Sequence, residues 1–566
     1  MRSLAFLLLL TGCAPSAYLE NPQITNHVDD WRDEVVYQVL VDRFANGDVN
    51  NDFNVSLDPN DLARYQGGDY EGLIAEADYL SQLGITAIWI SPVVANVEED
   101  AGVAGYHGYW TQDFTSVNPH FGDIAKLRQL VEVMHDRDIK VIVDIVVNHV
   151  GQLFYYDINR NGQADITTYY GTDGSDSLDV VTEWDPKFDP RRIQGWTSLG
   201  ESGEAPVEWV HMPEINRVGP NPPEFKNPDW YNRMGRVTDW NDNEQVMYGD
   251  FPGGLKDLAT ENPNVRRALI EIFSDWITKT NIDGYRIDTV KHVEHSFWEE
   301  FSPAIREHAA AIGKDKFLMF GESFDGNDQL IGSYTAPGML DSVANFSGKY
   351  RVFDGVFKNG APTSEVVALH EERQLNWGLE PQEGGIEVSA AEMPVNFLDN
   401  HDVPRFQFEQ ENDQALKTAL AFLLTGQGLP VIYYGTEQGF SGGNDPANRE
   451  DLWLSGYRTN GEIFQWTATL NEIRAEWPAL RRGDMQFVQT TDDGAGILAF
   501  QRTFNQESVV VAINTHDTEA RTVDVPSAFV SGVLVEDLLG GLAVTAGPDG
   551  QLVFELQPRQ SAILVE

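Results

Sequence analysis

The chain has 566 residues, too many for one compact core, so we expect two or three domains. Hydrophobic residues make up 42% of it and the mean hydropathy is -0.33, values typical of a soluble globular protein. Its 88 acidic residues outnumber 39 Lys and Arg residues, and the net charge of -49 disfavours nucleic acid and anionic lipid as partners. This acidity fits either adaptation to salt or plain solubility, and composition does not choose between them.

The first thirteen residues, MRSLAFLLLLTGC, have the features of a targeting segment. The apolar run at residues 4–10 is too short to span a bilayer as a mature helix. The sequence LTGC resembles the lipobox of bacterial lipoproteins, which implies a signal peptide at residues 1–12 and lipidation of Cys13. Residues 13–30 would then tether an exported, membrane-anchored protein, displayed at the outer membrane or cell surface. The alternative is a plain secretory signal. Because Cys13 is the only cysteine, no intramolecular disulfide is expected.

Eight short apolar runs alternate with helical patterns in the next part of the chain. They cover residues 34–44, 85–93, 140–150, 282–290, 316–323, 340–346, 393–401 and 429–439. Such runs, separated by amphipathic helices such as the one expected at 262–280, predict a parallel sheet covered on both faces. Eight of them predict an α/β fold with a (β/α)₈ barrel, although a doubly wound sheet would give the same alternation.

This rhythm breaks in two places. Residues 151–254 are rich in Asp, Asn, Gly, Pro and Trp, and a structureless loop of that size is implausible, so we expect an inserted domain after the third strand. After Arg482, short strands with turn signals predict an antiparallel β-sandwich at residues 483–566. The barrel would therefore consist of residues 31–150 and 255–482.

Polar side chains gather at the predicted carboxyl ends of the barrel strands, where barrel enzymes place their catalytic groups. In chain order they are His107, Tyr109, Asp144, Asn148, His149, Arg286, Asp288, Lys291, His292, Glu322, His401 and Asp402. Three carboxylates, Asp288, Glu322 and Asp402, should converge on one face. Any one of them could be a surface or capping acid. Three at the ends of apolar runs are hard to explain by stability, because a buried acid costs several kcal/mol unless compensated.

Glycoside hydrolysis requires such carboxylates, because one attacks the anomeric carbon and another protonates the leaving oxygen. Arg286 lies two residues before Asp288, on the same side of the strand, and is expected to lower the pKa of that carboxyl. Glu322 must instead stay protonated, which burial and neighbouring carboxylates favour. The aromatic residues of GYHGYW, which begins at Gly105, suit stacking on a sugar ring.

Four motifs at these strand ends, DIVVNH, GYRIDTVKH, GES and FLDNHD, resemble in order the signature regions of the α-amylase family of retaining glycoside hydrolases. The stretch GGNDPANREDLWLSGY (442–457) resembles the fungal Taka-type members, and the likeness covers residues 31–566. It implies that Asp288 is the nucleophile, Glu322 the acid/base and Asp402 the transition-state stabiliser. The implied substrate-binding residues are His107, Tyr109, Trp110, His149, Arg286, Lys291, His292, His401, Asp445 and Arg449. The insertion would be domain B and the sandwich domain C.

The resemblance also implies a calcium ion between the barrel and domain B. The matching ligands are Asn148, Asp257 and the backbone carbonyl of His292, and the spacing around the Gly-Asp pair at 249–250 adds Glu244. Oxygen ligands of this kind are those that Ca²⁺ prefers. Lys256 stands where the family usually has proline, and its cation could compete with the metal or point to solvent.

Two further loops are candidate calcium sites, so we expect one to three ions. DRFANGDVNND with the later GGD is similar to the first calcium site of the cyclodextrin glycosyltransferases, which implies Asn46, Asp48, Asn51, Asp52, the Gly67 carbonyl and Asp69 as ligands. An ordinary Asn/Gly turn is the alternative. DINRNGQAD resembles the start of an EF-hand loop, with Asp157, Asn159, Asn161 and Asp165 as candidates. That loop has Thr168 where a Glu ligand is expected, and a hairpin is its alternative.

Several functions are compatible with these motifs. The leading prediction is a monomeric, endo-acting α-1,4-glucan hydrolase acting on starch and maltooligosaccharides. A transglycosylase such as a cyclodextrin-forming enzyme is favoured by the opening loop and disfavoured because no further starch-binding domain follows the sandwich; a cyclomaltodextrinase is a third variant. A glycan-binding lipoprotein with an inactive barrel should lack one of the three acids, and all three are present.

Overall fold

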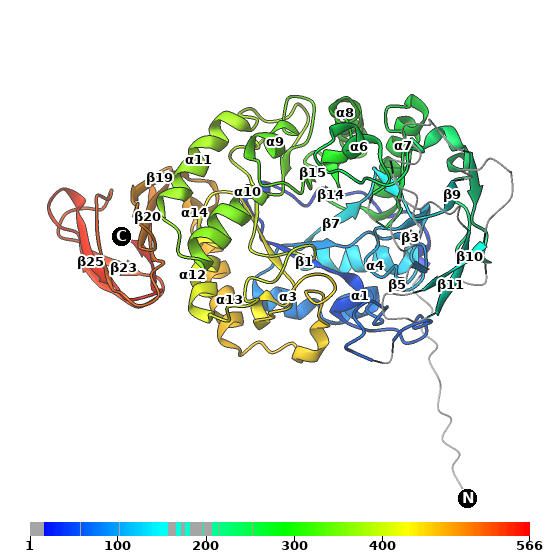
Figure 1. The fold of residues 1–566 in the computed structure, drawn as a ribbon. Helices are drawn as coiled ribbons and strands as arrows, with labels where there is room; N and C mark the ends of the chain where they lie inside the picture. The colour runs from blue at the N-terminus through cyan, green and yellow to red at the C-terminus, as the bar shows by residue number, and fades with distance from the viewer. Residues whose placement is uncertain are drawn as a thin grey trace, which may run out of the picture.

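The computed structural model describes residues 16–56, 58–100, 102–156, 166–170, 176–181, 196, 206–213, 216–251 and 253–566, and for residues 16, 17, 166–170 and 176–181 the backbone alone. Figure 1 shows a central barrel with the C-terminal strands on one side and β9, β10 and β11 of the inserted segment on the opposite side. In these ranges no helix has the length and apolar character that a membrane span requires.

Eight parallel strands form the barrel, which confirms the predicted fold class. In sheet order, each is hydrogen-bonded to the next: β16 (Ser342–Val343), β15 (Leu318–Gly321), β14 (Gly284–Ile287), β7 (Lys140–Ile145), β2 (Ala87–Ile90), β1 (Val36–Val39), β18 (Leu429–Tyr433) and β17 (Val395–Phe397). A parallel bridge between Ala344 and Val395 joins the two outer strands and closes the ring. Each strand lies within a predicted apolar run. Closure excludes the doubly wound sheet.

Helices cover the outside of the barrel. The principal ones are α2 (Tyr70–Ala75), α3 (Ala77–Leu83), α4 (Ile124–His135), α7 (Pro263–Thr280), α8 (His295–Ala311), α9 (Asp328–Ser333), α11 (Ser364–Asn376), α12 (Asp413–Thr425), α13 (Glu462–Glu476) and α14 (Pro478–Arg482). In α7 the side chain of Asn262 caps the first turn, Pro263 begins the helix, and Asn281 ends it in a left-handed conformation. Its apolar face packs on the sheet.

Shorter elements connect these helices and strands. They are α1 (Val41–Phe44), α6 (Asn243–Tyr248), α10 (Phe346–Gly348), the π-helix η8 (Lys349–Lys358), and the 3₁₀ turns η1 (Ser16–Leu19), η2 (Trp31–Asp33), η5 (Pro223–Lys226), η6 (Pro228–Trp230), η7 (Val290–His292), η9 (Thr436–Gln438), η10 (Leu452–Ser455) and η11 (Pro548–Gly550).

The interior of the barrel changes from apolar to polar along the strands. Val36 and Ile142 belong to a buried cluster that fills the barrel, with Trp31 covering its amino-terminal end. Because side chains alternate along a strand, Gln38 and Asp144, each two residues further on, point the same way. The polar layer at the carboxyl end of the sheet is therefore the place where the site forms.

The segment predicted to be a tether contacts the barrel from Tyr18 onward. Nη1 of Arg128 in α4 donates to the Tyr18 carbonyl at 3.0 Å. The Thr25 amide donates to Oδ1 of Asn281 at 3.1 Å, and Nε1 of Trp31 donates to the Lys316 carbonyl at 2.8 Å. Residues 18–31 therefore form a docked strap, which we call the N-terminal strap.

The insertion begins and ends on one short ladder, because β8 (His149–Val150) pairs antiparallel with β13 (Lys256–Asp257). Between them β9 (Phe154–Tyr156) pairs with β12 (Val207–Trp209), and β10 (Ile166–Tyr170) with β11 (Asp176–Val181). Two further short ladders lie in the barrel loop that follows β2: β3 (Val94–Asn96) pairs with β6 (Thr111–Val117), and β4 (Glu99–Asp100) with β5 (Val103–Ala104).

Two antiparallel sheets face each other at the C-terminus. One has the order β19 (Asp484–Gln489), β20 (Ile497–Phe504), β21 (Glu507–Asn514), β26 (Ser561–Val565), β23 (Leu534–Asp537), β24 (Ala543–Thr545). The other pairs β22 (Arg521–Val525) with β25 (Leu552–Leu556). Residues such as Val510, Val523 and Leu552 pack between them in a separate core. This is the predicted sandwich; the exact domain boundaries stay predictions.

Candidate active site

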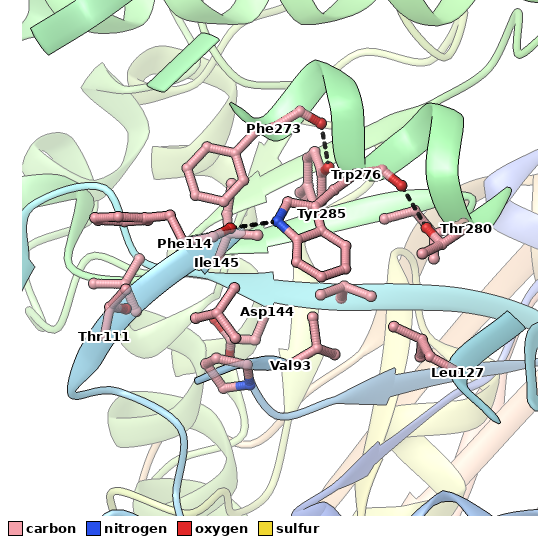
Figure 2. A pocket seen from close by; sticks show the side chains of 15 residues that line it. Val93, Thr111, Phe114, Leu127, Asp144, Ile145, Phe273, Trp276, Thr280 and Tyr285 are labelled. Atoms are coloured by element: carbon pink, nitrogen blue, oxygen red, sulfur yellow. Dashed lines mark hydrogen bonds between the residues drawn. The ribbon is translucent and has the colours of Figure 1, made fainter. Parts of the chain in front are cut away.

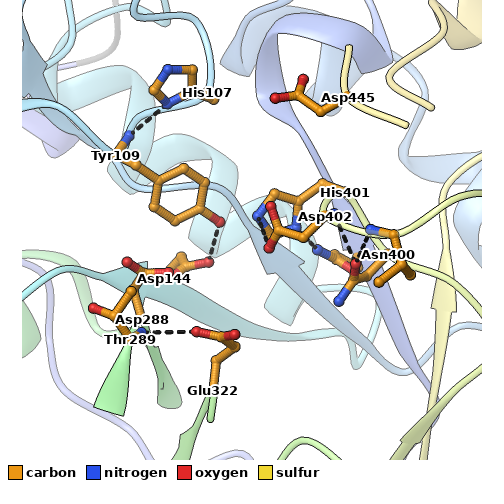
Figure 3. A network of polar contacts seen from close by, with 12 residues as sticks. His107, Tyr109, Asp144, Asp288, Thr289, Glu322, Asn400, His401, Asp402 and Asp445 are labelled. Carbon is orange, nitrogen blue, oxygen red and sulfur yellow. Dashed lines mark hydrogen bonds and ion pairs between the residues drawn. The ribbon is translucent and has the colours of Figure 1, made fainter. Parts of the chain in front are cut away.

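A single buried guanidinium joins two of the three predicted catalytic acids. Nη1 of Arg286 lies 2.8 Å from Oδ1 of Asp288 and 2.9 Å from both carboxylate oxygens of Asp144, while its Nη2 lies 3.6 Å from Oε2 of Glu322. Arg286 and Asp288 come from β14 and the residue after it, Asp144 from β7, and Glu322 directly follows β15. Figure 3 shows the carboxylates of Asp144, Asp288 and Glu322 close together at the ends of these neighbouring strands.

Burial dominates the protonation of these carboxyls. Desolvation raises the pKa of Glu322 to about 8; Arg286 opposes the shift, and the negative charges of Asp288 and Asp402 add to it. Desolvation also raises the pKa of Asp288 above its ordinary value, and Arg286 reduces but does not cancel this effect. The expected lowering of the Asp288 pKa is thus wrong in its net direction, because burial outweighs the ion pair. The raised pKa of Glu322 is the direction that a general acid requires.

Asp144 supports the site from below. Its Oδ2 accepts hydrogen bonds from the Tyr109 hydroxyl at 2.8 Å and from Nε1 of Trp89 at 3.1 Å, in addition to the contacts with Arg286. Its side chain is fully buried. The carboxylate therefore fixes Arg286 and the ring of Tyr109 in place, and it is out of reach for a substrate.

Asp402 lies across the opening from this group. Nε2 of His401 lies 3.1 Å from its Oδ2, and Nη2 of Arg449 lies 3.5 Å from its Oδ1. Gln38 occupies the other ring nitrogen of His401 at 2.7 Å, which leaves Nε2 free to donate toward Asp402. Nη1 of Arg449 also holds the exposed Asp445 at 2.9 Å. One third of the Asp402 side chain is exposed, so a ligand can reach it.

Aromatic and imidazole rings form the wall of the opening. The Tyr109 and His401 rings stack with centroids 5.2 Å apart, and His107 stacks on the other side of Tyr109 at 5.7 Å. Trp110 meets the His107 ring edge-on at 4.6 Å. His149 contacts the Tyr109 carbonyl at 3.2 Å, and burial lowers its pKa to about 4. These histidines are therefore neutral hydrogen-bonding groups near neutral pH.

The opposite wall carries the remaining predicted substrate contacts. Nζ of Lys291 donates to the Phe324 carbonyl at 2.6 Å. The ring of His292 meets the exposed Trp240 at 5.9 Å, and Nδ1 of His292 contacts the Val246 carbonyl at 2.9 Å. Next to Asp402, an open pocket of about 450 Å³ is lined by residues that include Phe324, Tyr350, Asp402 and Asn444.

A different, internal gap lies behind the site. It has a volume of only about 10 Å³ and lies between the barrel and helices α4 and α7 (Figure 2). Two of its polar groups are bonded internally, because Nε1 of Trp276 donates to the Phe114 carbonyl at 2.8 Å and the Tyr285 hydroxyl to the Phe273 carbonyl at 2.6 Å, whereas the Thr111 hydroxyl is buried without a partner. This gap is part of the packing and too small for a sugar.

The opening loop brings most of its predicted metal ligands together. Nδ2 of Asn46 reaches both oxygens of Asp52 at 3.0 and 2.9 Å, and Nδ2 of Asn51 lies 3.3 Å from Oδ2 of Asp69. Oδ1 of Asn51 is buried without a hydrogen-bond partner, which is the state a cation would relieve. A Cβ at Gly67 would lie 2.6–2.7 Å from Asn46 and Asp52, so the glycine keeps this cradle open. These residues fit Ca²⁺.

Asp48 is the exception in this loop. Its Oδ1 accepts from the amide and the Nδ2 of Asn50, at 3.1 and 2.6 Å, within its own turn. Its backbone amide, in contrast, donates to Oδ2 of Asp69 at 2.8 Å.

The second predicted site is partly assembled. Asp257 is 2% exposed and accepts a hydrogen bond from Nδ2 of Asn232 at 2.7 Å, and desolvation raises its pKa well above the ordinary value. No basic side chain in the described ranges forms an ion pair with it. Asn148 is buried beside it, since the Leu258 amide donates to the Asn148 carbonyl. An uncompensated buried carboxylate of this kind fits a cation site, whereas the Glu244 side chain is exposed.

Lys256 neither competes for this site nor points to solvent. Its Nζ forms a fully buried ion pair with Oδ2 of Asp250 at 2.7 Å and lies 4.4 Å from the centre of the Tyr156 ring. Because neighbouring strand residues face opposite ways, Lys256 points away from Asp257.

Two sets of predicted residues lie outside the described ranges: Cys13, and the third loop with Asp157, Asn159, Asn161 and Asp165. Among the residues that the structure describes, no three His, Cys, Asp or Glu side chains gather as a metal site. Both fitted sites accordingly depend on Asn side chains and backbone carbonyls as well as carboxylates.

Sequence reasoning missed several contributors to the site. Trp89 and Gln38 lie inside apolar strands, and their roles appear only from the register that places Gln38 beside Trp89. Tyr106 contacts Nη1 of Arg449 at 3.0 Å across 343 residues of chain. Thr289 has a positive φ of 51° and donates its amide to Oε2 of Glu322 at 2.9 Å. The apolar pattern carries no signal for such contacts.

A closed parallel barrel with three acids converging at the carboxyl ends of its strands defines a (β/α)₈-barrel protein with a carboxylate site. Residues 38–477 match the family model described as Alpha amylase, catalytic domain. The chain belongs to the α-amylase family.

Individual relatives agree with this assignment. The chain is 31% identical to a Beta/alpha-amylase of Paenibacillus polymyxa over 97% of its own length and 39% of the relative's. It is also 31% identical to an Alpha-amylase of Streptomyces lividans, over 90% of this chain and 57% of the relative. The chain thus spans well under two thirds of either protein.

Solved structures extend the comparison. An Anoxybacillus alpha-amylase superimposes with a TM-score of 0.72 at 30% identity, covering 95% of this chain and 98% of that one. A cyclomaltodextrin glucanotransferase described as having a three-domain ABC distribution gives a TM-score of 0.71 at 27% identity, covering 94% and 99%.

Proposed function

We propose that this protein hydrolyses internal α-1,4-glucosidic bonds of starch and maltooligosaccharides with retention of configuration. The observation that supports this most is the joint contact of Arg286 with Asp288 and Glu322, combined with a pKa of Glu322 raised to about 8. This arrangement provides one carboxylate and one carboxylic acid at neighbouring strand ends, as retaining glycoside hydrolysis requires.

The residues then act in two steps. Asp288 attacks the anomeric carbon and forms a bond to it, while the bond to the leaving oxygen breaks and Glu322 transfers its proton to that oxygen. The ionised Glu322 next takes a proton from water, which attacks the same carbon and releases Asp288. Asp402 and His401, which contact each other at 3.1 Å, are placed to hold hydroxyl groups of the cleaved sugar. Arg286 contacts both carboxyls and holds them in place.

Substitution of the two acids tests this assignment. We expect Asp288→Asn and Glu322→Gln each to lower the release of reducing ends from soluble starch by at least about 10³-fold, because each removes one chemical step. A matched control is Asp517→Asn, which removes an ion pair with Arg559 in the sandwich and should leave activity unchanged. Near-normal activity of either acid variant, with an unchanged Tm, would overturn the assignment.

A second candidate is transfer of the glycosyl group to sugar, including formation or opening of cyclodextrins. It is favoured by the opening loop, whose unpaired Asn51 carbonyl oxygen and Asp69 form the cation cradle, and by the likeness to a glucanotransferase with three domains. A time course of products from amylose, maltoheptaose and cyclodextrins distinguishes the two. Linear short products support hydrolysis, whereas cyclic or lengthened products as the main output support transfer.

We also propose one to three bound Ca²⁺ ions, at the opening loop, at Asp257 and at the third loop. The first two are supported by the partnerless oxygen of Asn51 and by the uncompensated burial of Asp257. When bound, calcium would supply positive charge to these carboxylates and hold the loops, and neither site includes Asp288 or Glu322. The role is therefore structural.

We finally propose that the protein is a monomer exported as a lipoprotein and anchored through Cys13, at the outer membrane or cell surface. The support is the sequence MRSLAFLLLLTGC. Incorporation of labelled fatty acid by the native chain and its loss in Cys13→Ser would test the anchor, and light scattering of the detergent-free chain without residues 1–13 would test the oligomeric state. Equal labelling of both chains would contradict lipidation.

A further inference from the structure

A small internal cavity of about 30 Å³ lies where the barrel meets the C-terminal sandwich. Residues of η8 and α11 form one side, and Met485 and Phe487 of β19 close the other. Figure 1 shows α11 and β19 next to each other at this boundary, and the rings of His370 and Phe487 meet at 5.4 Å. None of the three catalytic acids lines the cavity. It therefore needs an explanation of its own.

Arg373 of α11 lines this cavity, and its guanidinium contacts the ring of Trp377 at 5.6 Å but has no anionic partner within ion-pair distance among the described residues. Only 7% of the residue is exposed, and its Nε is buried with no hydrogen-bond acceptor. It forms no ion pair with any acid in the described part of the chain. The nearby Asp328 is already used by other donors: Ser347 Oγ at 2.7 Å, Asn376 Nδ2 at 2.8 Å and Trp377 Nε1 at 3.2 Å.

The other lining groups do not neutralise this charge. Most are apolar, among them Val352, Leu369 and Phe422, so the guanidinium is surrounded by groups that solvate it poorly. His370 is a neutral ring near neutral pH, because burial lowers its pKa to about 4. Arg373 is thus the one charged side chain among the residues that line the cavity.

The turn before β18 can supply a second hydrogen-bond donor to the cavity. Gln427 lines the cavity, and its Oε1 is buried without a partner. The two ends of a side-chain amide have the same shape, and a 180° rotation places an N–H group where Oε1 now lies. The cavity would then present N–H groups from Arg373 and Gln427, with no carboxylate lining it.

We propose that this cavity is a binding site for a small monovalent anion such as chloride, held by the guanidinium of Arg373 and the side-chain amide of Gln427. The volume is about that of one water molecule, which admits a halide and excludes sulfate or a sugar. A water molecule would satisfy the hydrogen bond of Nε but leave the buried positive charge, whereas an anion satisfies both. The bound ion would tie α11 to β19 and so stabilise the junction of barrel and sandwich.

Thermal unfolding of the full chain in different sodium salts tests this site. The protein is dialysed free of chloride, and Tm is measured against sodium chloride, bromide and gluconate at equal sodium concentration. Because an anion that binds only the folded state stabilises it by mass action, chloride and bromide should raise Tm saturably, by about 1–3 °C above gluconate. Gluconate is too large to enter, so it reports screening alone.

Variants locate the effect. Arg373→Met should lose the chloride increment, and Arg373→Lys, which keeps a positive charge, should retain part of it. Arg351→Gln is the matched control on η8, because Arg351 is paired with Glu372 and is partly exposed, and it should keep the full increment. Starch hydrolysis by each variant reports correct folding and is expected to be unchanged, since the cavity lacks the catalytic acids.

Two outcomes would overturn the site. Equal Tm values of the native chain in chloride and gluconate would mean that the cavity holds water only. A chloride increment that survives in Arg373→Met would place the anion elsewhere. Crystals soaked in bromide add a direct measurement, with an anomalous peak expected beside the Arg373 guanidinium. Neither outcome depends on the proposed glucan hydrolysis.

Discussion

At the scale of single residues, the proposed hydrolysis depends on keeping a proton on Glu322 while Asp288 is ionised. Burial raises the pKa of both groups, and that of Glu322 reaches about 8. The negative charge of Asp402 acts on both groups, and Glu322 also receives that of Asp288, whereas Asp288 has the shorter contact with Arg286, at 2.8 Å against 3.6 Å. The guanidinium thus separates two carboxyls that burial alone would treat alike.

The pH dependence of activity follows from this separation. The folded enzyme holds the proton of Glu322 up to a pH of about 8, and the acid step requires that proton. We expect kcat/KM on maltoheptaose to fall about tenfold per pH unit above that point. The Lys291→Met variant removes a nearby cation without removing an acid, so the pH at which its activity begins to fall should change little. Glu322→Gln, in contrast, should lose the alkaline limb of the pH profile altogether. An alkaline limb that begins below pH 6 would contradict the assignment.

Looking for polar residues at the carboxyl ends of predicted strands found the three acids, because a carboxylate inside an apolar run is visible in the sequence. It could not assign roles to Gln38 or Trp89, which look like ordinary strand residues and act only through the register beside β7 and β18. The net direction of the Asp288 pKa was also wrong, since the depth of burial depends on the closed barrel. The order of polar groups is thus readable in sequence, but not their desolvation.

At the scale of elements, the opening loop is organised by Asp69. Its side chain caps α2 through the Gly72 amide at 2.7 Å and also accepts from the amides of Gly47 and Asp48, at 3.1 and 2.8 Å. One carboxylate therefore joins a helix start to a loop that precedes it by about twenty residues. The sequence suggested a metal ligand, and the cap became visible only in the fold.

Replacement of Asp69 should cost stability before chemistry. We expect Asp48→Ala with Asp69→Ala to lower the free energy of unfolding by about 2–3 kcal/mol, mostly through Asp69, because a helix cap and two further amide hydrogen bonds are lost. Starch turnover at 25 °C should change less than about threefold. Asp58→Ala is the matched control, since Asp58 caps only the exposed Asn60 turn of the same loop.

Adding a chelator distinguishes the contribution of bound calcium to stability from that of the Asp69 helix cap. If calcium occupies the loop, excess EDTA should lower the Tm of the native chain and of Asp58→Ala, and it should have a smaller effect on the double variant. An unchanged Tm of the native chain in EDTA would argue against accessible structural calcium.

The N-terminal strap is a second element that the sequence did not reveal. A polar stretch after a targeting segment predicts a free tether, yet Arg128 donates to the Lys279 carbonyl, the Tyr18 carbonyl and Oδ1 of Asn21, at 2.7, 3.0 and 2.7 Å. The strap thus joins α4 to the end of α7 at the amino-terminal end of the barrel. These contacts join a guanidinium to backbone carbonyls and a side-chain amide, so hydrophobic periodicity could not predict them.

Removing this arginine should loosen the closed end of the barrel. We expect Arg128→Ala to lower the free energy of unfolding by about 1–3 kcal/mol, because three hydrogen bonds from a charged group are lost. Urea unfolding measures the change. Arg137→Ala, on the same side of the barrel but in an exposed pair with Asp78, should cost less than about 0.5 kcal/mol. Equal costs for the two variants would mean that the strap adds no stability.

At the scale of the whole molecule, the excess of acidic residues opposes the compact fold by charge repulsion. Some of the basic residues form ion pairs in the interior: Lys314 pairs with Asp283, and Arg306 pairs with Asp341, both fully buried. With only 39 basic residues against 88 acidic ones, many surface carboxylates remain without a partner. Their mutual repulsion favours the expanded chain, and it acts through water, where salt screens it.

Screening should therefore stabilise the native protein. As sodium gluconate rises from about 10 mM to about 1 M, the Debye length falls from roughly 30 Å to roughly 3 Å, and we expect Tm to rise continuously by several degrees. Gluconate avoids the proposed halide site, and an equal osmolarity of sucrose controls for solute exclusion. A Tm that is flat in gluconate would show that the acidic surface serves solubility alone. A native state that forms only near molar salt would instead identify adaptation to salt, the alternative that composition left open.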